Sequence, residues 1–151
     1  MRRRDVFDMT SKRSEYSASL KALMAFRRAS RRISQQEGRA IHAHGLTPSQ
    51  FGVLEVLYSD GALTVKDLLQ CVLSTSGNMT VVLRNLERDG LVLRMENPHD
   101  GRSYLFNLTE QGSALMERVM PEHEQNVEDI FSGLTAQQIE QLTNLLSKLK
   151  G

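Results

Sequence analysis

Hydrophobic residues recur at helical intervals through most of the chain and alternate with polar residues in one region. Apolar positions three and four residues apart predict helices at about 17–44, 48–59, 65–72, 76–90, 110–131 and 136–149. The stretches 91–96 and 104–108 show the alternation expected of strands. The predicted order is four helices, two strands and two helices, which describes a mainly α (α+β) protein with one β-hairpin.

Three of the predicted helices begin with the same starting signal. A leucine precedes a threonine that can cap the helix, and the third residue after the threonine can return the hydrogen bond. This signal lies at 46–50, 63–67 and 134–138. Gly45 supplies a stop for the first helix, and Pro121 is expected to kink the helix at 110–131 near Met120.

The connection between the two predicted strands is rich in turn formers. Residues 97–102 read Asn-Pro-His-Asp-Gly-Arg, so this hairpin is expected to project into solvent. A short helix at 65–72, a Ser/Thr-Gly turn, a second helix and a projecting hairpin follow one another in the order of a winged helix-turn-helix. We therefore predict that fold, with the hairpin as its wing.

The helix at 76–90 has two chemically different faces. One face gathers Met79, Val82, Leu83 and Leu86 and is expected to pack against the preceding helix. The other face is expected to contact base edges in a DNA major groove, and it carries Gly77, Asn78, Val81, Arg84, Asn85 and Arg88. The hydroxyls of Ser74, Thr75 and Ser76 are expected to hold phosphate oxygens. A face of this kind is more often merely solvated, so the DNA interpretation depends on the neighbouring turn and hairpin.

Composition narrows the classes of protein that remain. The chain has 151 residues, 40% hydrophobic and 25% charged, as expected of one globular domain. No apolar run approaches the roughly 18 residues of a membrane span, and no apolar signal core follows the first arginines, so we expect a cytoplasmic protein without membrane association.

The charge is divided unevenly along the chain. Residues 1–45 hold 11 Lys/Arg against 4 Asp/Glu, net +7, and residues 46–151 hold 8 against 14, net −6. The basic part includes Arg27, Arg28, Arg31 and Arg32. These arginines support nucleic-acid binding only weakly, because such a run can equally be a solvated helix face.

Several strings resemble the MarR family of bacterial regulators. They are Leu-Thr-Pro-Ser-Gln-Phe at 46–51, Asn-Leu-Glu-Arg-Asp-Gly-Leu-Val at 85–92, and the wing residues 97–103 followed by Leu-Thr-Glu-Gln-Gly at 108–112. The flanking helices match in length and order, so the resemblance covers nearly the whole chain. It implies a single chain, 1–151, with a winged helix-turn-helix at 46–112 and dimerisation helices at 14–45 and 113–151.

The resemblance also implies a function. The protein is expected to be a homodimeric transcriptional regulator, a repressor, that binds a near-palindromic double-stranded DNA operator without a cofactor and is relieved by a small aromatic or anionic effector. Arg102 resembles the family's wing arginine that enters the minor groove, and Asp100 resembles the carboxylate that orients it. Asn97 replaces the usual Asp and Gly101 replaces the first of two arginines, so weaker wing binding is expected.

Other functions find less support in the sequence. Catalysis is disfavoured because His42, His44, His99 and His123 are scattered and no phosphate loop or nucleophile motif occurs. A metal-responsive regulator would draw on His42, His44, Glu122, His123 and Glu124, yet no His-x-x-x-His pair is present. A winged helix that binds protein instead of DNA also stays open.

Cysteine usage bears on a redox-responsive alternative. A single residue, Cys71, cannot form an internal disulfide. It lies at the edge of the apolar face of the helix at 65–72, so we expect an inert core cysteine in place of a thiol switch.

Overall fold

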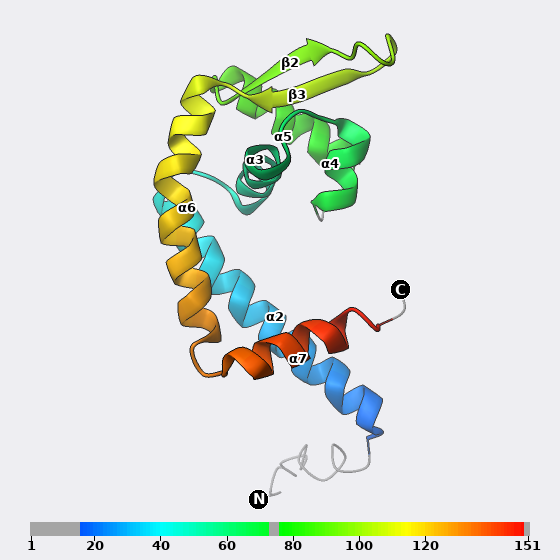
Figure 1. The fold of residues 1–151 in the computed structure, drawn as a ribbon, viewed down its shortest axis with the longest axis vertical. Coiled ribbons are helices and arrows are strands. Elements are labelled where there is room, and N and C mark those ends of the chain that lie inside the picture. Colours follow the sequence, from blue (N-terminus) through cyan, green and yellow to red (C-terminus); the bar gives the residue numbers. More distant parts are fainter. Residues whose placement is uncertain (1–15, 73–75, 150–151) are drawn as a thin grey trace, which may run out of the picture. The chain divides into compact units, whose positions relative to one another are not determined.

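The computed structural model describes residues 16–72 and 76–149. In these residues the elements follow in the order α2 (Ala18–Ala43), α3 (Pro48–Asp60), β1 (Leu63–Thr64), α4 (Val65–Cys71), α5 (Ser76–Arg88), β2 (Val92–Glu96), β3 (Tyr104–Leu108), α6 (Glu110–Phe131) and α7 (Ala136–Leu146) (Figure 1). The predicted helices and the hairpin are all present. The chain divides into two units, Met1–Gln36 and Glu37–Gly151, with the boundary inside α2.

Threonine caps fix the starts of α3, α4 and α7, as the repeated signal predicted. At α3 the Gln50 amide donates to Thr47 Oγ1 at 3.2 Å, and the Thr47 amide donates to Gln50 Oε1 at 2.9 Å. The same reciprocal pair forms between Thr64 and Asp67 at α4, and between Thr135 and Gln138 at α7. Each box pairs two amides that would otherwise lack partners in the first turn.

The β-sheet has three strands in the order β1-β3-β2, all antiparallel. The hairpin was predicted, but β1 was not. β1 consists of Leu63 and Thr64, which pair with Phe106 and Leu105 of β3. Two residues are too few to show an alternating pattern, so only the tertiary pairing reveals this strand.

A single core lies in the unit Glu37–Gly151. Its most buried side chains come from α3, α4, α5 and α6: Val53, Leu54, Leu57, Leu68, Met79, Leu86, Met116 and Val119. The apolar face predicted for α5 is buried here, with Val82 and Leu83 also inside. Burial of that face leaves the opposite face of α5 to solvent.

The connection from β3 to α6 is tied to the start of β2 by one threonine. Thr109 Oγ1 donates to the Gly90 carbonyl at 2.6 Å and accepts from the Gly112 amide at 3.0 Å, which caps α6. The Thr109 amide donates to the Leu91 carbonyl at 3.1 Å. This network gives a physical reason for the Leu-Thr-x-x-Gly string at 108–112.

Two details differ from the sequence prediction or extend it. Cys71 is exposed, so the expectation of a core cysteine was wrong. Leu68 is the one residue of α4 that is buried, and Cys71 ends the helix one turn after it, beyond the part that the core covers. Pro121 lies inside α6, which continues on both sides of it from Glu110 to Phe131.

Among the described residues, none of the helices has both the length and the apolarity that a bilayer crossing requires.

Candidate nucleic-acid interface

The outward face of α5 presents most of the residues predicted to contact DNA bases. Gly77, Asn78, Arg84 and Arg88 are exposed, and Val81 exposes 50% of its surface although it is β-branched and apolar. Asn85 is half-buried at the edge of this face. The structure thus brings these six residues together on one helix face, as the helical spacing predicted.

Some predicted residues are already engaged or lie outside the described part of the chain. Arg88 donates through Nε to the neighbouring Asp89 carboxylate at 3.1 Å, so that contact competes with any other anion. Ser74 and Thr75 fall outside the described residues, and so does the side chain of Ser76, the first residue of α5. Their predicted phosphate contacts stay predictions.

The wing loop between β2 and β3 is held by side chains at its two ends. Asn97 Nδ2 donates to Ser103 Oγ at 2.9 Å, and Asn97 Oδ1 accepts from the His99 amide at 3.0 Å. Ser103 Oγ in turn donates to the Asp100 carbonyl at 3.3 Å. Asn97, noted as a departure from the family pattern, therefore closes the loop through both halves of its amide.

Asp100 shapes the loop in a different way from the one expected. Its carboxylate accepts from the backbone amide of Arg102 at 3.0 Å, the contact of a turn in which an aspartate bonds two residues ahead. The expected contact was with the Arg102 guanidinium, which the structure does not place on this carboxylate. Arg102 itself is exposed at the tip of the hairpin.

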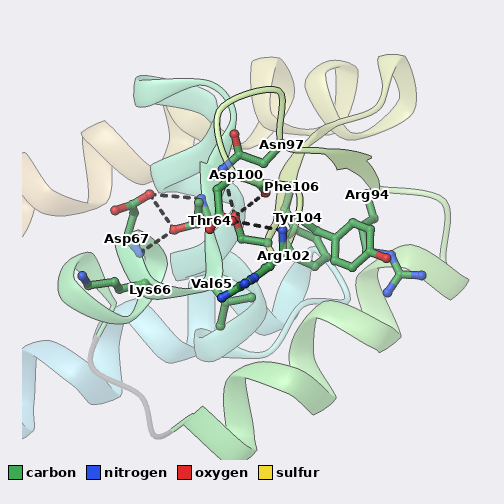
Figure 2. A pocket seen from close by; sticks show the side chains of 11 residues that line it. Thr64, Val65, Lys66, Asp67, Arg94, Asn97, Asp100, Arg102, Tyr104 and Phe106 are labelled. Carbon is green, nitrogen blue, oxygen red and sulfur yellow. Dashed lines mark hydrogen bonds between the residues drawn. The ribbon is translucent and has the colours of Figure 1, made fainter.

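A pocket of about 550 Å³ lies between the wing and the start of α4, and sequence reasoning missed it. Figure 2 shows Lys66 and Asp67 on the α4 side, Asn97 and Asp100 on the loop side, and Arg94 beside the ring of Tyr104. The guanidinium carbon of Arg94 stands 4.6 Å from the centroid of that ring. The alternation of the strands could have placed Arg94 and Tyr104 on one face of the hairpin. It could not have predicted that these side chains approach α4.

The carboxylate of Asp67 is occupied by its own helix cap. It accepts from Thr64 Oγ1 at 2.7 Å and from the Thr64 amide at 3.2 Å. These two hydrogen bonds, the hydroxyl one foremost, stabilise the charged form and hold the pKa of Asp67 below its ordinary value. Asp67 therefore lines the pocket as a carboxylate already paired with donors.

The histidines considered as metal ligands form separate pairs. His44 Nε2 lies 2.7 Å from Glu122 Oε2, and His123 Nε2 lies 3.5 Å from Glu55 Oε1. The ring of His123 also packs against Phe51, with centroids 4.7 Å apart. His42 and Glu124 are exposed. In the part of the chain that the structure describes, no group of three or more His, Cys, Asp or Glu residues could hold a metal ion.

Comparison with known proteins shows which family this chain belongs to. Residues 44–103 match the sequence profile of the MarR family. The HTH-type transcriptional regulator MhqR of Bacillus subtilis is 33% identical over 131 residues, which cover 87% of this chain and 90% of MhqR. The chain belongs to the MarR family. It is a DNA-binding regulator of transcription and not an enzyme.

Solved structures of MarR-type regulators share the fold. BpsR of Bordetella bronchiseptica superposes with a TM-score of 0.76 at 29% identity, over 85% of this chain and 97% of BpsR. A cysteine-to-serine mutant of MarR from E. coli, complexed with operator DNA, superposes with a TM-score of 0.75 at 25% identity, over 87% of this chain and 93% of that one. The winged helix-turn-helix predicted from the sequence is thus confirmed.

Proposed function

We propose that this MarR-family protein is a repressor that binds a near-palindromic operator as a homodimer and leaves it when a small aromatic or anionic effector binds. In each protomer α5 enters the major groove and the wing reaches the adjacent minor groove. The observation that carries the proposal is that one face of α5 is polar and exposed. A projecting hairpin lies beside this helix (Figure 1). Bacterial operators lie in the cytoplasm, so we place the protein there.

The chemistry of the α5 face suits base edges. Arg84 can donate two hydrogen bonds to guanine, and Asn85 can pair with adenine through its amide. Val81 offers methyl groups that match the methyl group of thymine. Val81 exposes 50% of its surface on this face, so its methyl groups are accessible for that contact.

Assembly as a homodimer is supported by apolar residues that each unit leaves exposed. In the unit Glu37–Gly151, α7 buries none of its residues, and Leu145 exposes 62% of its surface. In the unit Met1–Gln36, Leu20, Leu23 and Phe26 of α2 are also exposed. Exposed helices this apolar usually pack against another surface, and a second copy of the chain would cover both α2 and α7. We accordingly assign 46–112 to DNA binding, and 14–45 and 113–151 to dimerisation.

The chemical class of the effector is inferred from one similar protein. BpsR is described as regulated in its DNA binding by 6-hydroxynicotinic acid, an aromatic acid. The exposed arginines of α2, Arg27, Arg28, Arg31 and Arg32, offer positive charge that suits an anion of this kind. We extend the class of ligand, and not its identity, to this protein.

The test begins with a genome-wide map of bound DNA, which supplies the operator. On that operator Arg84→Ala should cost about 1–3 kcal/mol of binding free energy, with a smaller loss on random DNA, because a base contact is removed. Arg102→Ala should weaken binding most where A·T-rich flanks narrow the minor groove. Arg118→Ala removes an exposed arginine of α6 and is the charge-matched control. Light scattering checks that this variant keeps the oligomeric state of the parent, and it should then bind DNA like the parent.

Equal operator affinity of the parent, Arg84→Ala and Arg102→Ala at one salt concentration would overturn the assignment of α5 and the wing as the DNA-reading elements. Circular dichroism and melting temperature report whether the variants keep the fold. Both side chains are exposed, so neither change should disturb the core.

A further inference from the structure

Three cationic side chains border the pocket under the wing: Lys66 from α4, Arg94 from β2 and Arg102 from the wing loop (Figure 2). Two carboxylates border it as well. Asp67 is engaged by the Thr64 hydroxyl and amide, and Asp100 by the Arg102 amide. The acidic groups are therefore paired with donors inside the chain, while the cations have donors left for an anion from outside.

Arg94 occupies a defined place between α5 and the wing. It pairs across the hairpin with Phe106, so its side chain lies on the same sheet face as this core residue. Its guanidinium stands over the Tyr104 ring at 4.6 Å and lies 3.9 Å from Glu87 of α5. The pair with Glu87 is long, and about half of the Arg94 side chain is exposed.

The geometry of duplex DNA determines which part of the operator lies next to Arg94. The major and minor grooves are separated by one sugar-phosphate strand on each side. If α5 lies in the major groove and Arg102 in the adjacent minor groove, the strand between these grooves must cross the protein between α5 and the wing loop. Arg94, which borders the pocket and lies 3.9 Å from Glu87 of α5, is in that interval.

We propose that a backbone phosphate of the operator binds in this pocket, with Arg94 as a phosphate-binding residue and the Tyr104 ring as the group that orients it. The inference rests on the proposed function and adds a contact that the α5 face and the wing tip do not supply. A guanidinium presents two parallel N–H donors to phosphate oxygens, and stacking on a ring fixes its plane before binding.

A phosphate contact has a different signature from a base contact. Arg94→Gln removes the charge and leaves a shorter, uncharged polar side chain, so it should weaken binding to the operator and to random DNA by the same factor. The slope of log affinity against log salt should become shallower by about one unit. Arg118→Ala, the charge-matched control on α6, should leave that slope unchanged.

A scan of the DNA locates the phosphate without changing the protein. Operator duplexes are made with one neutral methylphosphonate at successive positions of the strand between the two grooves. With the parent protein, one position should cause a clear loss of affinity. With Arg94→Gln, the same position should cause no further loss, because its partner is already missing.

The role of Tyr104 is tested by two substitutions that leave Arg94 in place. Tyr104→Phe keeps the ring and should bind DNA like the parent. Tyr104→Leu removes the ring and should weaken binding and reduce the penalty at the sensitive phosphate, while its melting temperature stays near that of the parent. Tyr104→Leu with full affinity and the full phosphate penalty would remove Tyr104 from the proposal.

The outcomes separate this inference from the proposed function. If the parent binds no DNA, both are overturned. If the parent binds and Arg84→Ala loses specificity, yet Arg94→Gln keeps the parental salt slope and every methylphosphonate penalty, the phosphate pocket alone is overturned.

Discussion

The α-carbon of Gly112 packs so closely on the backbone of Leu91 that a Cβ at position 112 would overlap the Leu91 carbonyl oxygen. Gly112 is buried in the first turn of α6, where its amide donates to Thr109 Oγ1. The Leu91 carbonyl is itself bonded by the Thr109 amide and cannot easily withdraw. This contact sets the distance between α6 and the start of the wing.

Gly112→Ala should therefore destabilise the protein by about 3 kcal/mol, the upper part of the usual cost of overpacking, because the obstructing atom belongs to the backbone. Gly133→Ala is the matched control. Position 133 has open space around a Cβ and no positive φ, so alanine there should be neutral or slightly stabilising. Urea unfolding measures both, and equal stability of the two variants would contradict the reading of this contact.

The exposed face of α7 predicts the oligomeric state. Light scattering should give twice the 17.1 kDa of one chain. Leu142→Glu places a charge on the apolar face and should shift the protein toward monomers that bind the operator weakly, whereas Asn144→Glu adds the same charge on the other side and should leave the dimer intact. A parent that is monomeric at micromolar concentration and still binds tightly would refute the dimer.

The helix cap at α4 predicts a dependence of stability on pH. The pKa of Asp67 is lowered in the folded protein by the Thr64 hydrogen bonds, so the unfolded chain binds this proton more readily than the folded chain. The stabilisation is complete above about pH 5 and is lost as the pH falls through the lowered pKa.

Asp67→Asn should therefore be less stable than the parent at pH 7, by a gap that narrows toward pH 2, as followed by urea unfolding at a series of pH values. Thr64→Ser keeps the hydroxyl and should keep the parental pH profile. A gap that is the same at every pH would show that the carboxylate does not act through its charge.

Cys71 should react with a thiol reagent in the folded protein, because its side chain is exposed at the end of α4. Titration without denaturant should label one thiol per chain, the full cysteine content. Cys71→Ser should still bind the operator and respond to the natural effector. Peroxide-dependent release from DNA that disappears in this variant would instead make the thiol the sensor.

The parts of the fold that the sequence predicted are those determined by local chemistry. Thr47, Thr64 and Thr135 begin helices because each cap is completed within three residues. The burial of Met79 and Leu86 and the exposure of Arg84 follow from helical spacing alone.

The parts that the sequence did not predict depend on contacts between distant segments. The strand at Leu63–Thr64 exists only because β3 lies beside it. Arg94 joins the candidate site through a ring ten residues away and a pocket wall formed by α4. The family resemblance predicts that Asp100 contacts the Arg102 guanidinium, whereas in the structure its carboxylate accepts from the Arg102 backbone amide.

Thr64 belongs to two elements at once, since it pairs with Leu105 in the sheet and caps α4 through the Asp67 amide. The wing and α4 are therefore joined through one shared residue. We therefore expect the wing and α4 to move together when an effector binds. In the proposed dimer, we expect an effector to change the distance between the two winged helix-turn-helix units and to leave each unit unchanged. A shift of a few ångströms would then move the two α5 helices away from the spacing of successive major grooves.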